Sequence, residues 1–580
     1  MHTFKVWAPE RRRVHVVADG HRLAMQQREG GWWEISDVAA QAGTRYGYSL
    51  DGGDVRPDPR TRSQPDGVLG LSEVIDDSAH GWGDGAWRGM RLAGAVLYEL
   101  HTGTFSPPGT FEGIIERLPH LVSLGIDAIE LMPVAEFSGS RGWGYDGADL
   151  FAPHHAYGGP ASLKRLVDAC HSAGLGIVLD VVYNHLGPVG NFLSEFGPYF
   201  SDRHHTDWGA AFNFDGPASD EVRRFVIDNA LMWIRDYHID GLRLDAVHAI
   251  VDQSPLHLLE QLAQEVEALG VELHRVTFVV AESDLNDPRL VRGREAGGYG
   301  LAAAWADDWH HALHAALTGE RTGYYEDFGS LEVLGKALRQ AWVHDGAWSA
   351  HRQKTRGRKA SGLSSESFVI AVQNHDQIGN RPTGDRLGAL VDEDALKAAA
   401  ALLLMAPFTP MLFQGEEWAA SSPFQYFTDH SDPELGEAVR DGRRREFAAF
   451  DWPPEAFPDP QDPTTFDRSK LVWDEIDEPF HRRMLEWYRG LIELRRRLPV
   501  PREGAGAGIR VQVDDDARRL VFERDGISVR VNMGEGDWHS AISSDEHLLM
   551  SSRPEIRPIN DSICLPPSSV VILERSHLNV

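Results

Sequence analysis

The middle of the chain alternates between short apolar runs and longer amphipathic segments. Apolar runs of roughly four to eight residues are typical of buried strands, whereas apolar positions three and four apart are typical of helices. About eight such runs alternate with helical segments from residue 93 onward, which predicts an α/β fold of the (β/α)8 TIM-barrel type. The predicted strands cover residues 96–101, 128–132, 176–180, 241–245, 277–282, 301–305, 367–372 and 411–413.

Helices are predicted between several of these strands and after the last one. The clearest of them cover residues 111–124, 162–173, 221–237 and 255–269. A further helix is indicated by Met484, Trp487, Leu491 and Leu494, which share one face at helical spacing.

Both ends of the chain show a different pattern, in which apolar and polar residues alternate as they do in half-buried strands. Residues 1–90 are predicted to form an N-terminal β-sandwich domain, and residues 504–580 a C-terminal all-β domain. The catalytic barrel would then cover residues 91–503. The stretch 56–70 is rich in Pro and Gly and is predicted to be a linker.

Composition narrows the range of partners. The chain has 580 residues, with 57 Lys and Arg against 87 Asp and Glu, so its net charge is -30. Such a surface repels nucleic-acid phosphates and anionic membranes, so neither is expected as a partner. The longest apolar run, residues 398–408, is too short to span a membrane. Cys170 and Cys564 do not make a disulfide framework, and we expect a soluble cytoplasmic protein.

The predicted strand 241–245 ends on a charged pair. Residues two apart in a strand point to the same side, so Arg243 and Asp245 would face one way and Leu242 and Leu244 the other. A neighbouring guanidinium favours the ionised carboxylate, which is the form that a nucleophile needs. A structural ion pair at a strand end would give the same pattern.

Polar clusters also follow three other predicted strands, at residues 180–185, 281–283 and 374–376. The C-terminal ends of the strands form the active site of a TIM barrel. Asp245, Glu282 and Asp376 are therefore expected to share one pocket, although they are far apart in sequence. Each alone could be a helix cap or a surface ion pair, but three at barrel strand ends favour catalysis.

The chemistry that fits these carboxylates is glycoside hydrolysis, which needs one carboxylic acid and one carboxylate. Asp245 is expected to be the nucleophile. Glu282 follows an apolar run, and because a drier setting raises a carboxyl pKa, we expect it to be the general acid. Asp376 is expected to form hydrogen bonds to sugar hydroxyls that strengthen as the ring distorts.

Other polar and aromatic residues could contact the same sugar. His185 and His375 are expected to donate to its hydroxyls, and Trp143 and Tyr145 could stack on its face, although ordinary core packing would explain these residue types too. The sequence contains no tight pair of metal ligands, so no metal and no cofactor are expected. Asn184 could help to order a calcium ion, but an ordering role in its own loop is the simpler interpretation.

The segments 180–185, 241–245, 280–283 and 373–376, in this order, resemble the four sequence regions of the α-amylase superfamily. This resemblance spans the barrel and implies a retaining mechanism. It implies that Asp245 forms the covalent glycosyl-enzyme, that Glu282 acts as acid and then as base, and that Asp376 stabilises the transition state. The positions that bind the sugar at the cleavage point match Arg243, His185, His375 and Tyr145.

Two further segments, 305–314 and 413–430, resemble the maltooligosyltrehalose trehalohydrolases, a family of that superfamily. The resemblance covers nearly the full length. It implies hydrolysis of the α-1,4-glucosidic bond next to the terminal trehalose unit of maltooligosyltrehalose, with release of trehalose. Asp308 in the first segment and Tyr426 and Phe427 in the second are expected to bind substrate. The aromatics follow the eighth strand and so lie at the barrel rim, where they could stack on sugar rings and hold the trehalose end, although packing under a loop would also place aromatics there.

Two alternatives remain at this point. A 1,4-α-glucan branching enzyme would use the same carboxylates but would transfer a glucan chain to a sugar hydroxyl. A non-catalytic glucan-binding barrel is the alternative from another class, and the intact carboxylates argue against it. The basic stretch 353–359 departs from the trehalohydrolase pattern and is predicted to be a solvated loop near the barrel mouth. The sequence gives no indication of the oligomeric state.

Overall fold

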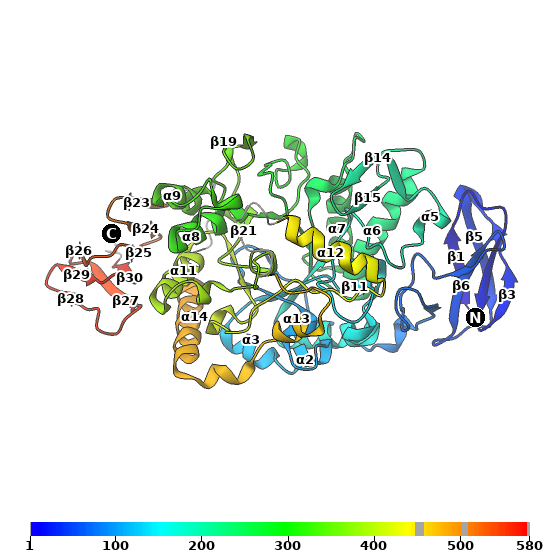
Figure 1. Cartoon of the computed structure of the whole chain (residues 1–580), viewed down its shortest axis with the longest axis horizontal. Coiled ribbons are helices and arrows are strands. Elements are labelled where there is room, and N and C mark those ends of the chain that lie inside the picture. The colour runs from blue at the N-terminus through cyan, green and yellow to red at the C-terminus, as the bar shows by residue number, and fades with distance from the viewer. Residues whose placement is uncertain (1, 447–456, 500–507, 577–580) are drawn as a thin grey trace.

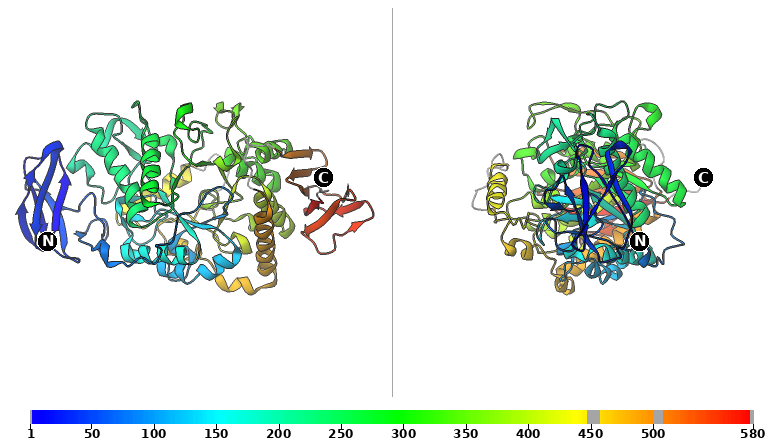
Figure 2. Two further views of the ribbon diagram at one scale, coloured as in Figure 1. Left: turned by 180° about the vertical axis from the view of Figure 1, so that it is seen from behind. Right: turned by 90° about the vertical axis from the view of Figure 1, so that its right-hand side faces the viewer.

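The computed structural model describes residues 2–446, 457–499 and 508–576. A central barrel lies between two β-rich regions at opposite ends of an elongated molecule (Figure 1). The view from behind shows the same arrangement, with the N-terminal sheets and the C-terminal sheets on either side of the barrel (Figure 2).

The barrel is closed and all of its strands are parallel, as the alternating pattern predicts. Its strands, in the order of hydrogen bonding, are β10 (Ala128–Leu131), β13 (Gly176–Val181), β16 (Gly241–Leu244), β17 (Phe278–Ala281), β18 (Ala303–Trp305), β21 (Phe368–Ala371), β22 (Thr409–Phe413) and β9 (Leu97–Leu100). Each predicted strand therefore corresponds to one strand of the barrel, with ends that differ by one or two residues.

Close packing inside the barrel explains the glycine that opens β16. A Cβ atom on Gly241 would lie 2.3 Å from the ring of Phe278, its partner on β17. Phe278 belongs to a buried cluster that also contains Val178, Trp305 and Val369. The bulky ring needs the space that a glycine leaves, so Gly241 allows this part of the barrel to fill without a void.

The helices cover the outside of the barrel, and one prediction for them is wrong. The segment 111–124 forms two helices, α2 (Phe111–Ile115) and α3 (Leu118–Leu124), and not one. Pro119 lies in the first turn of α3, where its missing N–H costs nothing, and it would break a continuous helix. The other predicted helices match α4 (Gly159–Ser172), α6 (Ser219–Asp236), α7 (Leu258–Leu273) and α14 (Pro479–Arg497).

The N-terminal region consists of two antiparallel sheets, as predicted for a β-sandwich. It contacts the barrel through α5 (Leu193–Phe196), where Arg56 pairs with Glu195 at 2.9 Å. The prediction of a linker at 56–70 is wrong, because Thr61 and Gln64 are fully buried there. Asp58 is also buried and accepts a hydrogen bond from the Tyr46 hydroxyl at 2.8 Å. Pro and Gly shape a packed connection here, and not a flexible one.

The C-terminal region contains a five-stranded and a three-stranded antiparallel sheet, and it packs against α9 (Leu331–Gln340) and α11 (Glu393–Met405). Arg495 of α14 and Arg524 of β24 (Arg519–Arg524) both donate to the carbonyl of Ala406, at 2.7 and 2.8 Å. These buried guanidinium groups satisfy carbonyls beyond the C-terminus of α11 and connect the barrel to the sheet.

Three two-stranded hairpins extend the loops of the barrel: β11–β12 (Ala135–Phe137, Gly147–Pro153), β14–β15 (Phe200–Thr206, Gly209–Phe212) and β19–β20 (Asp345–Ser349, Lys354–Gly357). The stretch 353–359, predicted to be a solvated loop, contributes β20. Its Arg356 donates to the carbonyl oxygen of Asp284 at 2.9 Å, two residues after Glu282. The basic stretch is thus tied to the barrel mouth. No helix among the described residues is long and apolar enough to cross a membrane.

Candidate active site

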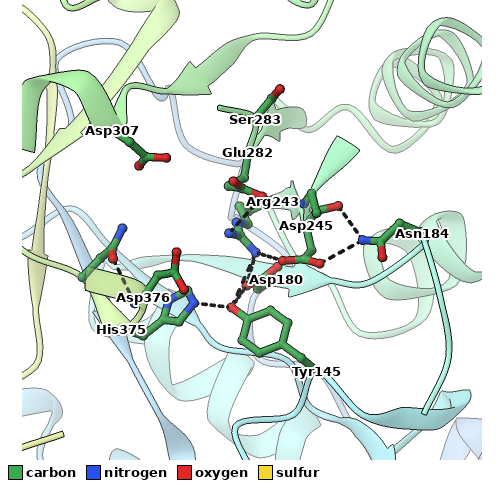
Figure 3. Close-up of polar contacts among 12 residues, drawn as sticks. Tyr145, Asp180, Asn184, Arg243, Asp245, Glu282, Ser283, Asp307, His375 and Asp376 are labelled. Atoms are coloured by element: carbon green, nitrogen blue, oxygen red, sulfur yellow. Dashed lines mark hydrogen bonds and ion pairs between the residues drawn. The ribbon is translucent and has the colours of Figure 1, made fainter. Parts of the chain in front are cut away.

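Arg243 lies at the centre of the carboxylate cluster (Figure 3). Its Nη1 atom is 2.6 Å from Asp180 and 3.0 Å from Asp245, and its Nη2 atom is 3.7 Å from Glu282. Residues 243 and 245 therefore share one side of the chain, as the strand period predicts. One buried guanidinium holds two of the predicted catalytic carboxylates at the same place.

Asp245 follows directly after β16, and its side chain remains 14% exposed. Besides the bond from Arg243, its carboxylate accepts one from Asn184 at 2.9 Å, and Asn184 also donates to the backbone carbonyl of Asp245 at 3.0 Å. Asn184 thus orients both the nucleophile candidate and its backbone, which goes beyond the loop-ordering role that the sequence suggests.

Glu282 follows β17 and accepts a hydrogen bond from the backbone N–H of Ala246 at 2.5 Å. Ala246 adopts a left-handed conformation, with φ 39°, which is uncommon for a residue with a side chain and directs this N–H at the carboxyl group. Burial raises the pKa of Glu282 well above its usual range, against the opposing effect of Arg243. The charges of Asp245, Asp307 and others raise it further. A carboxyl group in this setting can remain protonated and act as an acid.

Asp376 lies in the first turn of α10 (His375–Gly379), and its side chain is exposed at the barrel mouth. It accepts a hydrogen bond from Asn380 at 2.7 Å. Asp307, the first residue of α8 (Asp307–Thr318), points toward the same space as Asp376 and Glu282 (Figure 3). Burial and the charge of Asp376 raise the pKa of Asp307 to about 7. The predicted carboxylates therefore meet, together with one that sequence reasoning did not select.

His375 and Tyr145 belong to a chain of hydrogen bonds beneath these carboxylates. Glu99 accepts from Nδ1 of His375 at 2.5 Å, while Nε2 of His375 lies 2.9 Å from the Tyr145 hydroxyl. That hydroxyl donates to Asp180 at 2.6 Å, so the chain of contacts runs from Glu99 through His375 and Tyr145 to Asp180. Burial lowers the pKa of His375, but the Glu99 carboxylate outweighs this effect and the net shift is upward.

His185 follows Asn184 in sequence and lies near enough to Asp245 to feel its charge, but burial lowers the pKa of His185. Its Nδ1 atom is bonded to the side-chain oxygen of Asn184. Its ring stacks on Trp208, with centroids 5.6 Å apart. Trp208 lies in the turn between β14 and β15 and is about half exposed, so this hairpin brings an open aromatic surface next to a predicted sugar-binding residue.

The structure does not place Asp308, predicted to bind substrate, where it could contact a sugar. Its carboxylate is 2% exposed and accepts three hydrogen bonds, each at 2.7 Å, from the Asn286 amide and the backbone N–H groups of Val343 and His344. It organises the loop after α9 (Leu331–Gln340), and it is the preceding residue, Asp307, that faces the barrel mouth. The side chains of consecutive helix residues point about 100° apart, so Asp307 and Asp308 face in different directions.

The rim aromatics are also mostly packing residues, which corrects the prediction for Trp143 and Phe427. Phe427 is fully buried and packs against Phe466, and Trp143 is 6% exposed and stacks on Phe424. The indole N–H of Trp143 donates to the carbonyl of residue 425 at 2.9 Å. Tyr426 is the partly exposed member of this group, and the Arg443 guanidinium lies 4.5 Å from its ring centroid.

Sequence reasoning missed Glu99, Asp180 and Asp307 as members of the site. Asp180 carried a visible signal, since it begins one of the four polar clusters and precedes Asn184 and His185. Glu99 and Asp307 gave weaker signals: one is a charged residue inside an apolar strand, and the other is one of two adjacent acids. The partner of Glu99 is His375, whose Nδ1 atom lies 2.5 Å from the carboxylate.

Comparisons with known proteins identify chains of similar sequence and fold. The family model described as alpha amylase, catalytic domain, matches residues 57–216. A malto-oligosyltrehalose trehalohydrolase of Rhizobium sp. (strain M-11) is 48% identical over 98% of this chain and 97% of its own length. One from Arthrobacter ramosus is 52% identical over 90% of both chains. A crystal structure of a Salmonella typhimurium protein assigned to the alpha amylases is 37% identical, with a TM-score of 0.90 over 99% of this chain and 97% of that one.

Proposed function

Because this chain belongs to the malto-oligosyltrehalose trehalohydrolase family, within the α-amylase superfamily, we propose that it releases trehalose from maltooligosyltrehalose. The bond that breaks is the α-1,4-glucosidic bond next to the terminal trehalose unit. The observation that most supports this chemistry is the single guanidinium of Arg243, which contacts Asp245 at 3.0 Å and Glu282 at 3.7 Å. A retaining glycosidase needs its two carboxyl groups close together, at a separation of about 5 Å.

In the first half of the proposed reaction, an oxygen of Asp245 attacks the anomeric carbon of the glucosyl unit that precedes trehalose. The bond between this carbon and the bridging oxygen breaks, and Glu282 gives its proton to that oxygen. The elevated pKa of Glu282 supports its role as the acid. Trehalose leaves, and the remaining chain is bound to Asp245 as a β-linked ester.

In the second half, Glu282 is ionised and accepts a proton from a water molecule. The resulting hydroxide attacks the anomeric carbon, and the ester bond to Asp245 breaks. The product is a maltooligosaccharide whose anomeric carbon has the original α configuration, and both carboxyl groups return to their starting states. Asp376 would bond the sugar hydroxyls and stabilise the oxocarbenium-like transition state.

Arg243, His375 and Tyr145 would hold the sugar and the nucleophile in position. Arg243 orients Asp245, since it donates a hydrogen bond to the carboxylate at 3.0 Å. Tyr145 and His375 are linked to Asp180 and Glu99, so their orientations are fixed before substrate binds. We propose that Tyr426, the partly exposed aromatic of the rim, contacts the trehalose end.

The test is chromatography of the products from maltooligosyltrehalose with the full-length chain. Free trehalose and a maltooligosaccharide shortened by the corresponding units are the expected products. New α-1,6 branches after incubation with amylose would support the branching alternative, and binding without any product would support the non-catalytic one. Either result would overturn the proposal.

A further inference from the structure

A second cluster of ionisable side chains lies at the base of the β11–β12 hairpin. It contains Glu136 of β11 and two histidines that follow β12, His154 and His155. Oε1 of Glu136 is 3.1 Å from Nδ1 of His154 and 2.7 Å from Nδ1 of His155. In the part of the chain that the structure describes, no other group of three such residues brings its ligand atoms within 4.8 Å of one another.

His154 provides an independent indication that this cluster binds something. Its side chain is fully buried and stacks on Phe137, with centroids 3.8 Å apart. Nδ1 lies close to Glu136 without meeting hydrogen-bond geometry, and Nε2 has no hydrogen-bond partner among the described residues. Buried polar atoms nearly always have a partner, so an imidazole in this state needs an explanation.

The cluster is also accessible from outside. The His155 side chain is about one-third exposed and lines a cavity of about 600 Å³, together with Gln64, Pro153 and Lys164. This cavity shares no lining residue with the carboxylate cluster around Arg243. An ion could therefore reach the cluster from the His155 side, while Glu136 and His154 are fully buried, and a water molecule could occupy a coordination position on the cavity side.

We propose that Glu136, His154 and His155 form a binding site for a divalent transition-metal ion of the zinc type. Two imidazoles and one carboxylate are a donor set that suits Zn²⁺ or Co²⁺, whereas Ca²⁺ and Mg²⁺ prefer oxygen ligands alone. Zinc has ligands at about 2.0–2.2 Å, and tetrahedral coordination separates neighbouring ligand atoms by more than the present contacts of 3.1 and 2.7 Å from Glu136 to the two histidines. Small side-chain rotations that replace these contacts by metal bonds would complete three positions, with water as the fourth.

The ion would join the two arms of the hairpin at its base. The loop between β11 and β12 carries Trp143 and Tyr145, which pack or bond in the active site. Bound metal would thus hold together the base of the segment that carries Tyr145. It should also raise the Tm of the chain, because metal binds only the folded arrangement of the three ligands.

The test measures zinc bound to the full-length chain after treatment with a chelator, dialysis against ZnCl₂ and elemental analysis. His155→Gln removes a partly exposed ligand, and His21→Gln, at an exposed histidine of β3 (His21–Ala24), is the matched control. We expect wild type and His21→Gln to bind one more zinc per chain than His155→Gln. Loss of a direct ligand should weaken binding by more than the roughly 10- to 100-fold typical of an outer-shell partner.

Equal zinc content in all three proteins would overturn the proposal, as would the absence of zinc from wild type. If His155→Gln does not fold, anomalous scattering from Zn²⁺-soaked crystals of the wild-type chain decides the question. A peak between the three side chains supports the site, and peaks only elsewhere contradict it. None of these results depends on which sugar the chain hydrolyses.

Discussion

Strand β16 has an aspartate at each end, and the two carboxylates differ in their surroundings. Asp240, before the strand, is 2% exposed and accepts hydrogen bonds from the Trp87 indole at 2.7 Å and the backbone N–H of Ile177 at 2.9 Å. Its second oxygen is also 3.1 Å from His171. Asp245, after the strand, remains partly open to the barrel mouth.

The difference separates an enclosed carboxylate from one that remains open on one side, as the proposed nucleophile must be. Both carboxylate oxygens of Asp240 accept hydrogen bonds from protein donors, and no side of the carboxylate is open to a ligand. We therefore expect Asp240 to stabilise the N-terminal end of the barrel. Asp245 is held from one side by Arg243 and Asn184, and its remaining face is available for a substrate. The proposed roles of the two aspartates, structural for Asp240 and catalytic for Asp245, follow the rule that barrel enzymes place catalysis at the C-terminal ends of the strands.

The largest expected effect on activity is that of Asp245→Asn. The amide is too weak a nucleophile to form the ester, so we expect kcat to fall by at least about 10⁴-fold, as is typical when a nucleophile is removed. Circular dichroism and the Tm should stay close to wild type, because the amide keeps the shape. Measurable turnover near the wild-type rate would contradict the assignment.

Glu282→Gln is expected to have the next largest effect on activity. Without the acid, kcat should fall by roughly 10²- to 10⁴-fold on natural substrate. The loss should be much smaller for the glycosylation step with a substrate whose leaving group needs no proton, such as a glycosyl fluoride. Pre-steady-state kinetics on both substrates measure this, and equal losses on both would exclude Glu282 as the acid.

Asp240→Asn is the matched substitution at the other end of β16. The amide must turn its N–H protons toward either the Trp87 indole N–H or the backbone N–H of Ile177, and both are donors. A buried hydrogen bond is therefore lost, and the free energy of unfolding should fall by about 1–3 kcal/mol. Activity per folded molecule should be unchanged, since the residue lies at the opposite end of the strand. Denaturant unfolding and active-site titration test this, and a large loss of kcat without loss of stability would erase the distinction between the two aspartates.

Tyr426→Ala should have a moderate and selective effect. If Tyr426 contacts the trehalose end, kcat/KM for maltooligosyltrehalose should fall roughly tenfold, equivalent to about 1.4 kcal/mol, with a smaller change for plain maltooligosaccharides. Phe427→Leu, a conservative change at a fully buried neighbour, serves as a control for packing. Equal losses on both substrates with Tyr426→Ala would argue against a trehalose contact.

Asp307→Asn should have the smallest effect, on pH dependence. The charge of Asp307 helps to raise the pKa of Glu282, so its removal should lower that pKa. Because Glu282 must be protonated to act as the acid, activity is lost as pH rises through its pKa. The alkaline limb of the kcat/KM profile should therefore move to lower pH in the variant. An alkaline limb at the same or a higher pH than in wild type would show that Asp307 does not raise the pKa of Glu282.

Sequence reasoning succeeded where a residue's position follows from the strand period. Arg243 and Asp245 had to share a side, and Glu282 and Asp376 had to follow barrel strands, so the topology brings them together. It did not predict which of two adjacent residues of the same type faces the active site. Nothing in the sequence shows that Asp307 faces the mouth while Asp308 bonds Asn286, because this depends on the orientation of α8.

The rim and the stretch 56–70 show a second limit. Aromatic residues after a barrel strand can stack on a ligand or on each other, and the composition is the same in both cases. Phe427 is fully buried and Tyr426 is not, a difference that depends on residues from distant parts of the chain such as Phe466 and Arg443. Likewise, Pro and Gly predict a turn-rich path for 56–70, but they do not reveal whether that path is packed.

The most direct test of the account is identification of the residue that forms the covalent intermediate. The Glu282→Gln variant, incubated with a 5-fluoroglycosyl fluoride, should accumulate an ester because hydrolysis of the intermediate is slowed. Peptide mass spectrometry after proteolysis should then find one glycosyl unit on Asp245. A glycosyl group on any other carboxylate, or a β-configured product without an adduct, would contradict the claim that Asp245 is the nucleophile of a retaining reaction.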